Sequence, residues 1–216
     1  MTGADNLIVL KHKRPSQPQG PLGFLFMKTI LFIDGRNFLD KLSFVKKDID
    51  FSVYNFRGLI DKVLSGVKVD DSVFYLGKLL EHPETVQKSK ELIEKQRLLK
   101  NNLEKQGFKV TITGRVRGHM EKCIKGHETL TFREKGVDVK ISIDMVTLSC
   151  DKKLKTAVIG SSDSDLQPAV RELQKRGVER IYLGFENSPN KGLTFTTNRT
   201  ILIRNSEILE FLIKNV

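Results

Sequence analysis

The feature that most constrains this chain is an alternation of short apolar runs with longer segments of helical period. The apolar runs have the length and the β-branched content of buried strands, and they occur at 29–33, 72–76, 108–112, 156–160, 180–183 and 201–203. The segments of helical period occur at 54–64, 84–106, 137–148, 166–176 and 207–213. Strands that alternate with helices are joined by right-handed crossovers. The pattern therefore predicts an α/β protein with a central, mostly parallel sheet and helices on both faces.

The composition excludes several classes of protein. The chain has 216 residues, of which 39% are hydrophobic and 29% charged, so we expect one folded domain rather than a disordered chain. Its two cysteines, Cys123 and Cys150, cannot form a disulfide scaffold, which indicates a reducing compartment such as the cytoplasm. The longest apolar stretch, 21–35, is interrupted by Lys28 and Asp34 and is shorter than the ~18–20 apolar residues of a membrane-spanning helix, so we expect no membrane contact.

The first 26 residues differ from the remainder of the chain. A basic cluster at 11–14 precedes a stretch rich in proline and glutamine at 15–21, and neither has a helix or strand period. The segment lacks the apolar core and the cleavage site of a signal peptide. We interpret 1–26 as a flexible leader or tail, with a basic arm that touches nucleic acid as the alternative, and 27–216 as a single domain.

Carboxylates follow two of the predicted strands. Asp34 comes directly after the first strand, Asp163 and Asp165 come after the fourth, and Asp138 begins the helix that leads into the fourth strand. Because ligands bind outside the carboxyl ends of strands in a parallel sheet, we expect these groups to converge on one rim. Clustered carboxylates repel one another and are costly to bury unless a divalent cation neutralises them. A site with oxygen ligands suits Mg²⁺ or Mn²⁺, and beside a basic surface it suits phosphodiester hydrolysis by metal-activated water.

Each of these acids also has a purely structural interpretation. Asp34 with Gly35 is typical of a tight turn, Asp163 or Asp165 is typical of a helix N-cap, and Asp138 is favourable at the N-terminus of its helix. The convergence of three separate groups on one rim favours a functional site over three unrelated structural roles.

The segments that carry these acids resemble a known family. They read FIDGRN at 32–37, KGVD at 135–138 with Asp144 following, and SSDSDL at 161–166. In order and spacing they resemble the NYN domain, in the LabA/DUF88 branch of the PIN-like nuclease superfamily, and the resemblance covers residues 28–213. It implies a three-layer α/β/α fold and a metal-dependent ribonuclease that we expect to be an endoribonuclease, with RNA as its partner.

The resemblance also implies roles for individual residues. Asp34, Asp138 and Asp163 would bind Mg²⁺ or Mn²⁺, with Asp165 as a fourth carboxylate, and Asn37 would hold Asp34 or a metal-bound water through its amide.

Three further residues in these segments have a supporting role or a structural one. Asp144 matches a family position, but it lies about 240° around the helix from Asp138, so both cannot point at one ion. Its alternative is a structural contact to a neighbouring loop. Ser161 and Ser162 either orient a water or phosphate or cap the following helix.

A basic insert at 113–135 separates the third strand from Asp138. It holds six cations against three glutamates, a net charge of +3; the cations are Arg115, Arg117, Lys122, Lys125, Arg133 and Lys135. Its alternating pattern predicts a β-hairpin, which together with Arg36 would hold RNA phosphates over the acids, or else is a solvated surface hairpin. Phe132 either stacks on a base or packs in the core.

Several weaker patterns remain open. His119, Cys123 and His127 would align on a helix and suggest zinc, although the nearby glycines argue against a helix. Polar residues near the end of the fifth strand are candidates for substrate contacts: Asn187, Lys191, Asn198 and Arg199.

The net charge of +11 favours a polyanionic partner, for which we expect RNA, single-stranded or structured. A homodimer stays open. Two other functions compete with the nuclease: a catalytically weak RNA-binding or regulatory module, and a phosphatase of the haloacid dehalogenase type. The phosphatase family places its nucleophilic Asp-x-Asp after the first strand, whereas here the pair follows the fourth.

Overall fold

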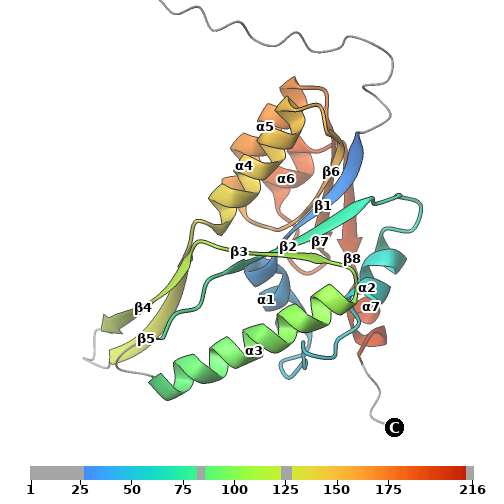
Figure 1. The fold of residues 1–216 in the computed structure, drawn as a ribbon. Coiled ribbons are helices and arrows are strands. Elements are labelled where there is room, and N and C mark those ends of the chain that lie inside the picture. Colours follow the sequence, from blue (N-terminus) through green and yellow to red (C-terminus); the bar gives the residue numbers. More distant parts are fainter. Residues whose placement is uncertain (1–26, 82–85, 123–127, 213–216) are drawn as a thin grey trace, which may run out of the picture.

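The protein is built around a six-stranded parallel sheet (Figure 1). The computed structural model describes residues 27–81, 86–122 and 128–212, and for 117–122 and 128–133 it describes the backbone. The strands of the sheet are β1 (Lys28–Asp34), β2 (Asp71–Gly77), β3 (Lys109–Thr113), β6 (Leu154–Gly160), β7 (Glu179–Phe185) and β8 (Arg199–Ile203). They lie in the order β3-β2-β1-β6-β7-β8, which confirms the predicted sheet.

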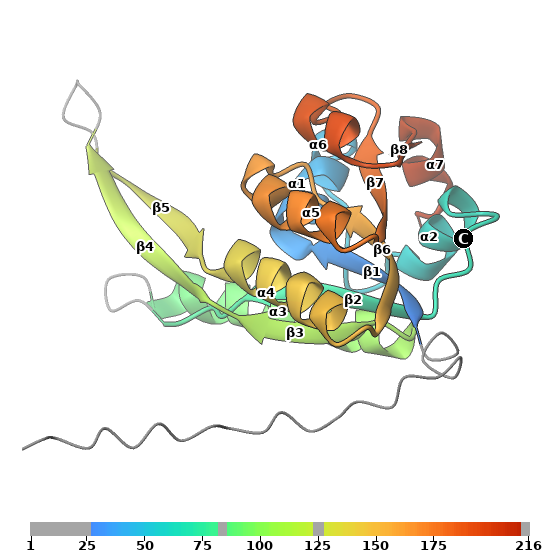
Figure 2. The ribbon, with the colours of Figure 1, turned by 90° about the horizontal axis from the view of Figure 1, so that it is seen from above.

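Helices cover both faces of this sheet. One face is covered by α1 (Gly35–Val45), α2 (Phe56–Val63), α3 (Val86–Lys105) and α7 (Asn205–Glu210). The other is covered by α4 (Val137–Cys150), α5 (Gln167–Lys175) and α6 (Lys191–Thr196). The two groups lie on opposite sides of the strands in Figures 1 and 2, so the architecture is the expected three-layer α/β/α arrangement.

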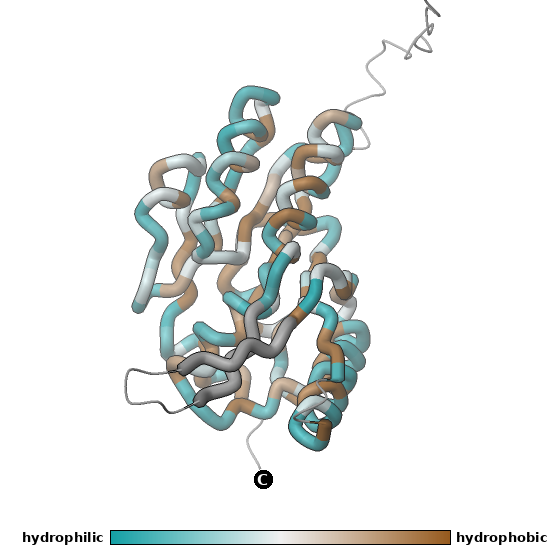
Figure 3. The backbone as a smooth tube through the Cα atoms, turned by 90° about the vertical axis from the view of Figure 1, so that its left-hand side faces the viewer, coloured by the Kyte–Doolittle hydropathy of each residue, from teal (hydrophilic) through white to brown (hydrophobic). Residues whose placement is uncertain are grey.

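The strands are apolar on both faces because each face packs against helices. Along β1, Leu31 and Ile33 point into the core under α1 and α2, whereas Ile30 and Phe32 point into the core under α4 and α5. In Figure 3 the apolar colouring concentrates on the central strands and the helix sides that face them.

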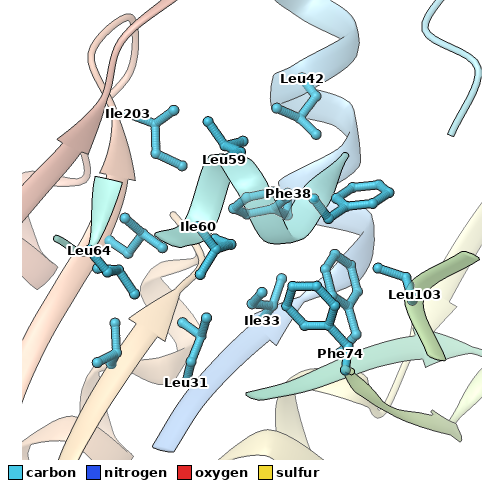
Figure 4. Close-up of a cluster of buried hydrophobic side chains, with 14 of the residues drawn as sticks. Leu31, Ile33, Phe38, Leu42, Leu59, Ile60, Leu64, Phe74, Leu103 and Ile203 are labelled. Carbon is cyan, nitrogen blue, oxygen red and sulfur yellow. The ribbon is translucent and has the colours of Figure 1, made fainter. Parts of the chain in front are cut away.

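Aromatic rings fill much of the first core (Figure 4). Phe38 of α1 meets Phe74 of β2 edge to face, with ring centroids 5.9 Å apart, and Phe56 of α2 lies 5.7 Å from Phe74. All three side chains are fully buried. These contacts fix α1 against the carboxyl end of the sheet, where the candidate site lies.

The predicted strands and helices in the described ranges are present, but two helices were not predicted. No helix was predicted at 35–45, where Asp34 with Gly35 had a tight turn as its structural alternative, whereas α1 begins at Gly35. The sequence analysis also missed α6, which has six residues and follows Asn190 as its N-cap. A helix as short as α6 carries too few turns for a clear apolar period.

The basic insert forms the expected hairpin, confirmed in its backbone. Strands β4 (Arg115–Lys122) and β5 (Glu128–Lys135) pair antiparallel and extend away from the sheet (Figure 2). At its foot, Gly114 and Gly136 both adopt positive φ, at 61° and 93°. A side chain at Gly114 would collide with the carbonyl oxygen of Lys135. Glycine is therefore needed where the hairpin leaves β3.

Some predictions fall on segments that the structure does not describe. The leader, residues 1–26, lies outside the described residues, as do Lys125, Cys123 and His127. His119 lies on strand β4, so at that position the helix required for a zinc site is not formed. Within the described ranges, no helix combines the length and the apolar character needed to cross a lipid bilayer.

Candidate active site

The site lies where the strand order of the sheet reverses. The chain passes from β1 outward through β2 and β3, then returns to place β6 on the other side of β1. Such a switch point opens a crevice between the carboxyl ends of two adjacent strands, because their following connections run in opposite directions. Here the two strands end at Asp34 and Gly160.

Asp34 is the most deeply buried acid of the site, with 7% of its surface exposed. Its Oδ1 accepts a hydrogen bond from the backbone N–H of Asn37 at 3.1 Å, which caps α1, and its Oδ2 accepts one from the Ser161 hydroxyl at 3.2 Å. Burial raises the pKa of Asp34. The two hydrogen bonds oppose that rise, and the nearby charges of Asp163 and Asp138 add to it.

Gly35 allows this aspartate to sit where it does. A Cβ at Gly35 would lie 2.5 Å from the carbonyl oxygen of Tyr75, so only glycine fits where α1 begins against β2. Asp34 and Gly35 are therefore the start of a helix, and the tight-turn interpretation is wrong.

Hydrogen bonds organise the segment that follows β6. The Ser161 hydroxyl accepts from the N–H of Asp163 at 3.1 Å, and Asp163 Oδ1 accepts from the N–H of Asp165 at 2.9 Å. Asp163 thereby caps the short 3₁₀ helix Ser164–Leu166, as one of the structural alternatives predicted. Because its Oδ1 is used in the cap, the carboxylate is held in one orientation at the mouth of the crevice.

Asn37 ties the two segments together in a way the sequence did not predict. Its side-chain Oδ1 accepts a hydrogen bond from the N–H of Ser162 at 2.9 Å, while its contact to Asp34 comes from its backbone. Asn190, which sequence reasoning missed, donates from Nδ2 to the carbonyl of Ser162 at 2.9 Å. The Ser162 hydroxyl shares a hydrogen bond with Tyr182 at 3.1 Å, so this serine anchors the loop rather than a helix.

The acids line one open cavity of about 590 Å³. Its walls are Asp34, Arg36, Asn37, Asp40, Glu134, Lys135, Gly136, Val137, Asp138, Val139, Asp163 and Asp165. All four aspartates expected to bind metal are among them, together with Asn37, Arg36 and Lys135. We call this cavity the acidic recess.

Glu134 is a further acid of the recess that sequence reasoning missed. It was counted only as a negative charge within the basic hairpin, although it directly precedes the KGVD segment. Its carboxylate accepts a hydrogen bond from the N–H of Gly77, and burial, with Asp34 as the next contributor, raises its pKa to about 7. The positive charge of Arg36, which lies close by, partly opposes this rise in the pKa of Glu134.

Other predicted residues lie elsewhere. Asp144 does not line the recess; its Oδ2 accepts from the Tyr75 hydroxyl at 3.0 Å and its Oδ1 pairs with Lys140 at 2.5 Å. This is the structural contact that the sequence analysis kept open, although it reaches a strand rather than a loop. It fastens α4 to β2.

The predicted cations of the hairpin are only partly placed. Arg115 and Lys135 are exposed at the foot of the hairpin, paired in register across it. For Arg117, Lys122 and Arg133 only the strand backbone is described, as is the case for Phe132.

Two of the polar candidates after the fifth predicted strand were placed wrongly. Because β8 runs parallel to β7, its first residue lies at the opposite edge of the sheet from the recess. Arg199 is that first residue, and Asn198 accepts from the N–H of Arg180 near the start of β7 at 2.9 Å. Asn187 is engaged with Asn205 through two side-chain hydrogen bonds.

The type of donor atom in the recess fits a hard cation. Its acids are carboxylates without sulfur or imidazole among them, and carboxylate oxygen is the ligand that Mg²⁺ and Mn²⁺ prefer. Burial raises the pKa of Asp34, and the nearby charges of Asp163 and Asp138 add to that rise, which a bound cation would offset. In the described ranges, no three His, Cys, Asp or Glu side chains are spaced as ligands of a single ion.

Comparison with known proteins identifies the family. The model of the NYN domain family matches residues 28–204, which is most of the chain and includes every acid of the recess. The chain belongs to the NYN domain family. That family lies within the PIN-like nuclease superfamily, whose members generally depend on a divalent metal.

One solved structure supports the fold. A protein of unknown function from Vibrio parahaemolyticus superposes with a TM-score of 0.53 at 16% identity, over 82% of this chain and 94% of that one. The tetrameric inhibited form of phosphofructokinase-2 from Escherichia coli matches with a TM-score of 0.29 at 11% identity, over 62% of this chain and 42% of that one, which is too low to support an argument. No curated protein matches the chain.

Proposed function

We propose that this NYN protein is a Mg²⁺- or Mn²⁺-dependent ribonuclease that hydrolyses phosphodiester bonds in RNA, acting as an endoribonuclease. The observation that supports this most directly is the acidic recess at the switch point of the sheet. Three segments far apart in the sequence contribute its carboxylates: Asp34 with Asp40, Glu134 with Asp138, and Asp163 with Asp165. A protein that only binds phosphate gains nothing from such a concentration of negative charge.

The residues of the recess divide into those that would hold the metal and those that position them. Asp34, Asp138 and Asp163 would bind the ion, with Asp165 beside them. When bound, the metal would activate water and neutralise charge that develops on the phosphate. Asn37 holds Asp34 through its backbone and the segment after β6 through its side chain, so the relative position of both acids depends on it.

Cations around the recess would bind the substrate. Arg36 and Lys135 line it, and Arg115 lies exposed beside Lys135 at the foot of the hairpin. We propose that these three bind RNA phosphates, and that the remaining hairpin cations extend the contact; they are Arg117, Lys122, Lys125 and Arg133. Because phosphate contacts release counterions, binding should weaken steeply as salt is raised.

The experiment is a cleavage assay on labelled single-stranded RNA of mixed sequence. The purified protein is incubated with Mn²⁺, with Mg²⁺ and with EDTA, beside an Asp34→Asn/Asp163→Asn double variant. An Asp61→Asn/Asp151→Asn variant is the matched control, because both of these acids are exposed and lie outside the recess. We expect metal-dependent internal cleavage by the wild type and the control, and none by the folded recess variant.

Two outcomes would contradict the proposal in different ways. Salt-sensitive RNA binding without cleavage in any metal would support the catalytically weak binding module instead. Cleavage that survives in the recess variant would mean that the active site lies elsewhere. We further propose the cytoplasm as the location, as expected from the cysteine content, and leave self-association to sedimentation analysis.

A further inference from the structure

A second depression adjoins the acidic recess. It is a trough of about 880 Å³ between α1 and α3, floored by the end of β2. Arg36, Asp40 and Glu134 line both the trough and the recess, so the two open into one another. The trough is therefore within reach of a nucleotide next to a phosphate that lies in the recess.

The walls of the trough are mainly apolar. Its apolar residues come from α1, the segment 47–52, the end of β2, α3 and the hairpin; they are Leu39, Ile49, Phe51, Leu76, Leu79, Leu92, Leu98, Leu99 and Val116. Leu98, on α3, is 39% exposed and forms part of this apolar wall.

Hydrogen bonds hold this trough open in a defined shape. The side-chain amide of Asn102 on α3 donates to the carbonyl oxygens of Phe51 and Tyr54, each at 2.9 Å. Gln96, also on α3, donates to the carbonyl of Gly77 at the floor, at 2.8 Å. These hydrogen bonds fix α3 against the Phe51 backbone and the end of β2 before a ligand arrives, which reduces the entropy lost on binding.

The charges around the trough distinguish a base from a phosphate. The exposed cations Lys78, Arg115 and Lys135 lie near the foot of the hairpin, where trough and recess meet. Further along, Lys47, Asp48, Asp50 and Lys95 line the trough but not the recess, two cations against two acids. A phosphate would be attracted to the cations at the junction and gain no net attraction further along, whereas a heterocyclic base would contact the apolar wall and donate its N–H groups to Asp48 or Asp50.

We propose that the trough binds one base of the substrate RNA, the base next to the phosphate held in the recess. This inference rests on the proposed nuclease function and adds to it the position at which the enzyme contacts a base. Its volume lies in the range of about 300–1,000 Å³ that small-molecule pockets occupy. A base that contacts the wall typically contributes about a tenfold gain in affinity or more.

The test uses a set of short single-stranded RNAs that differ only in the position of one abasic nucleotide. Binding is measured in EDTA, and cleavage of the same set is measured in Mn²⁺, for the wild type and for Leu98→Glu. Leu209→Glu is the matched control, since Leu209 is 47% exposed on α7 and lines neither cavity.

For the wild type and the control we expect one abasic position, adjacent to the cut bond, to weaken binding about tenfold. Leu98→Glu should weaken binding of the intact RNA by a similar factor and remove the penalty at that position, because the introduced carboxylate interrupts the apolar wall that the base contacts.

The possible failures are distinguishable. RNA that is bound and cut without a position-specific penalty, or with the same penalty in Leu98→Glu, would overturn the base-binding trough and leave the nuclease intact. This is also the result expected if the trough binds a protein partner. An absence of RNA binding and cleavage by the wild type would overturn both proposals.

Discussion

Replacing Glu134 by glutamine should make the metal-free protein more stable at neutral pH. Glu134 is partly buried, accepts from the N–H of Gly77 and lies near Asp34, and burial first and Asp34 second raise its pKa from 4.5 to about 7. A carboxyl group whose pKa is raised by folding stabilises the folded protein fully at pH values below its pKa in the unfolded chain. That stabilisation is lost as the pH rises through the pKa of the group in the folded protein.

The size of the effect follows from the two pKa values. The difference between 4.5 and about 7, at about 1.4 kcal/mol per pH unit, corresponds to about 3 kcal/mol. Partial exposure to solvent screens the carboxylate, so we expect about 1–3 kcal/mol. Glutamine keeps a carbonyl oxygen for the Gly77 N–H and removes only the charge, so the packing at the foot of the hairpin should be preserved.

The measurement is urea denaturation in EDTA at a series of pH values from about 4 to 8. Near pH 4 the variant and the wild type should have the same free energy of unfolding, and near pH 8 the variant should be more stable by about 1–3 kcal/mol. Glu81→Gln, at an exposed position, should follow the wild type throughout. The argument that burial and the charge of Asp34 raise the pKa of Glu134 would be refuted by either of two results. One is an unfolding free energy that depends on pH in the same way in the wild type and in Glu134→Gln, and the other is a variant less stable than the wild type at pH 8.

Three other substitutions test the packing around the site. Gly35→Ala should cost about 1–3 kcal/mol in urea denaturation, because its Cβ would meet the Tyr75 carbonyl at 2.5 Å; wild-type stability would show that α1 can shift freely. Tyr75→Phe should lower the unfolding free energy by about 1–2 kcal/mol, because the Tyr75 hydroxyl donates to Asp144. RNA cleavage should stay within about twofold of the wild type, since Asp144 lies outside the recess. A large loss of cleavage would give Asp144 a catalytic role. Asp71→Asn should cost about 1 kcal/mol of unfolding free energy near pH 7, because hydrogen bonds from two lysines lower the pKa of Asp71. This difference from the wild type should vanish in acid, where the wild-type carboxylate becomes protonated as the pH falls through its folded pKa. A difference in stability that persists in acid would contradict this.

The layered fold could be predicted from the sequence because its pattern is local. Runs such as 29–33 are apolar at every position, which is compatible only with burial on both faces of a sheet. The helices around Leu99 and Leu173 have a clear apolar period and end at glycines. By contrast, α1 was missed because the motif at its start is polar, and its apolar residues Phe38 and Leu42 became informative only once packed against β2.

The candidate site could be predicted in part. Asp34, Asp138, Asp163 and Asp165 were assigned to one rim from their positions after strands and at a helix start, and the structure brings them to one recess. The role of Asn37 was different from the expected one, because hydrogen-bond partners depend on which loops lie opposite each other.

By itself, the sequence determined the alternation of strands and helices, the direction of the sheet and the edge at which the acids gather. The alternation depends on the period of apolar residues along the chain, and the other two properties follow because strands joined by helical crossovers run parallel and end at the same edge. Only the tertiary structure decided that Glu134 joins the recess, that Asp144 leaves it for Tyr75, and that Leu98 lines a trough beside it. Those outcomes depend on the strand order β3-β2-β1-β6 and on the foot of the hairpin, which lies beside the end of β2; both bring together residues that no local pattern relates.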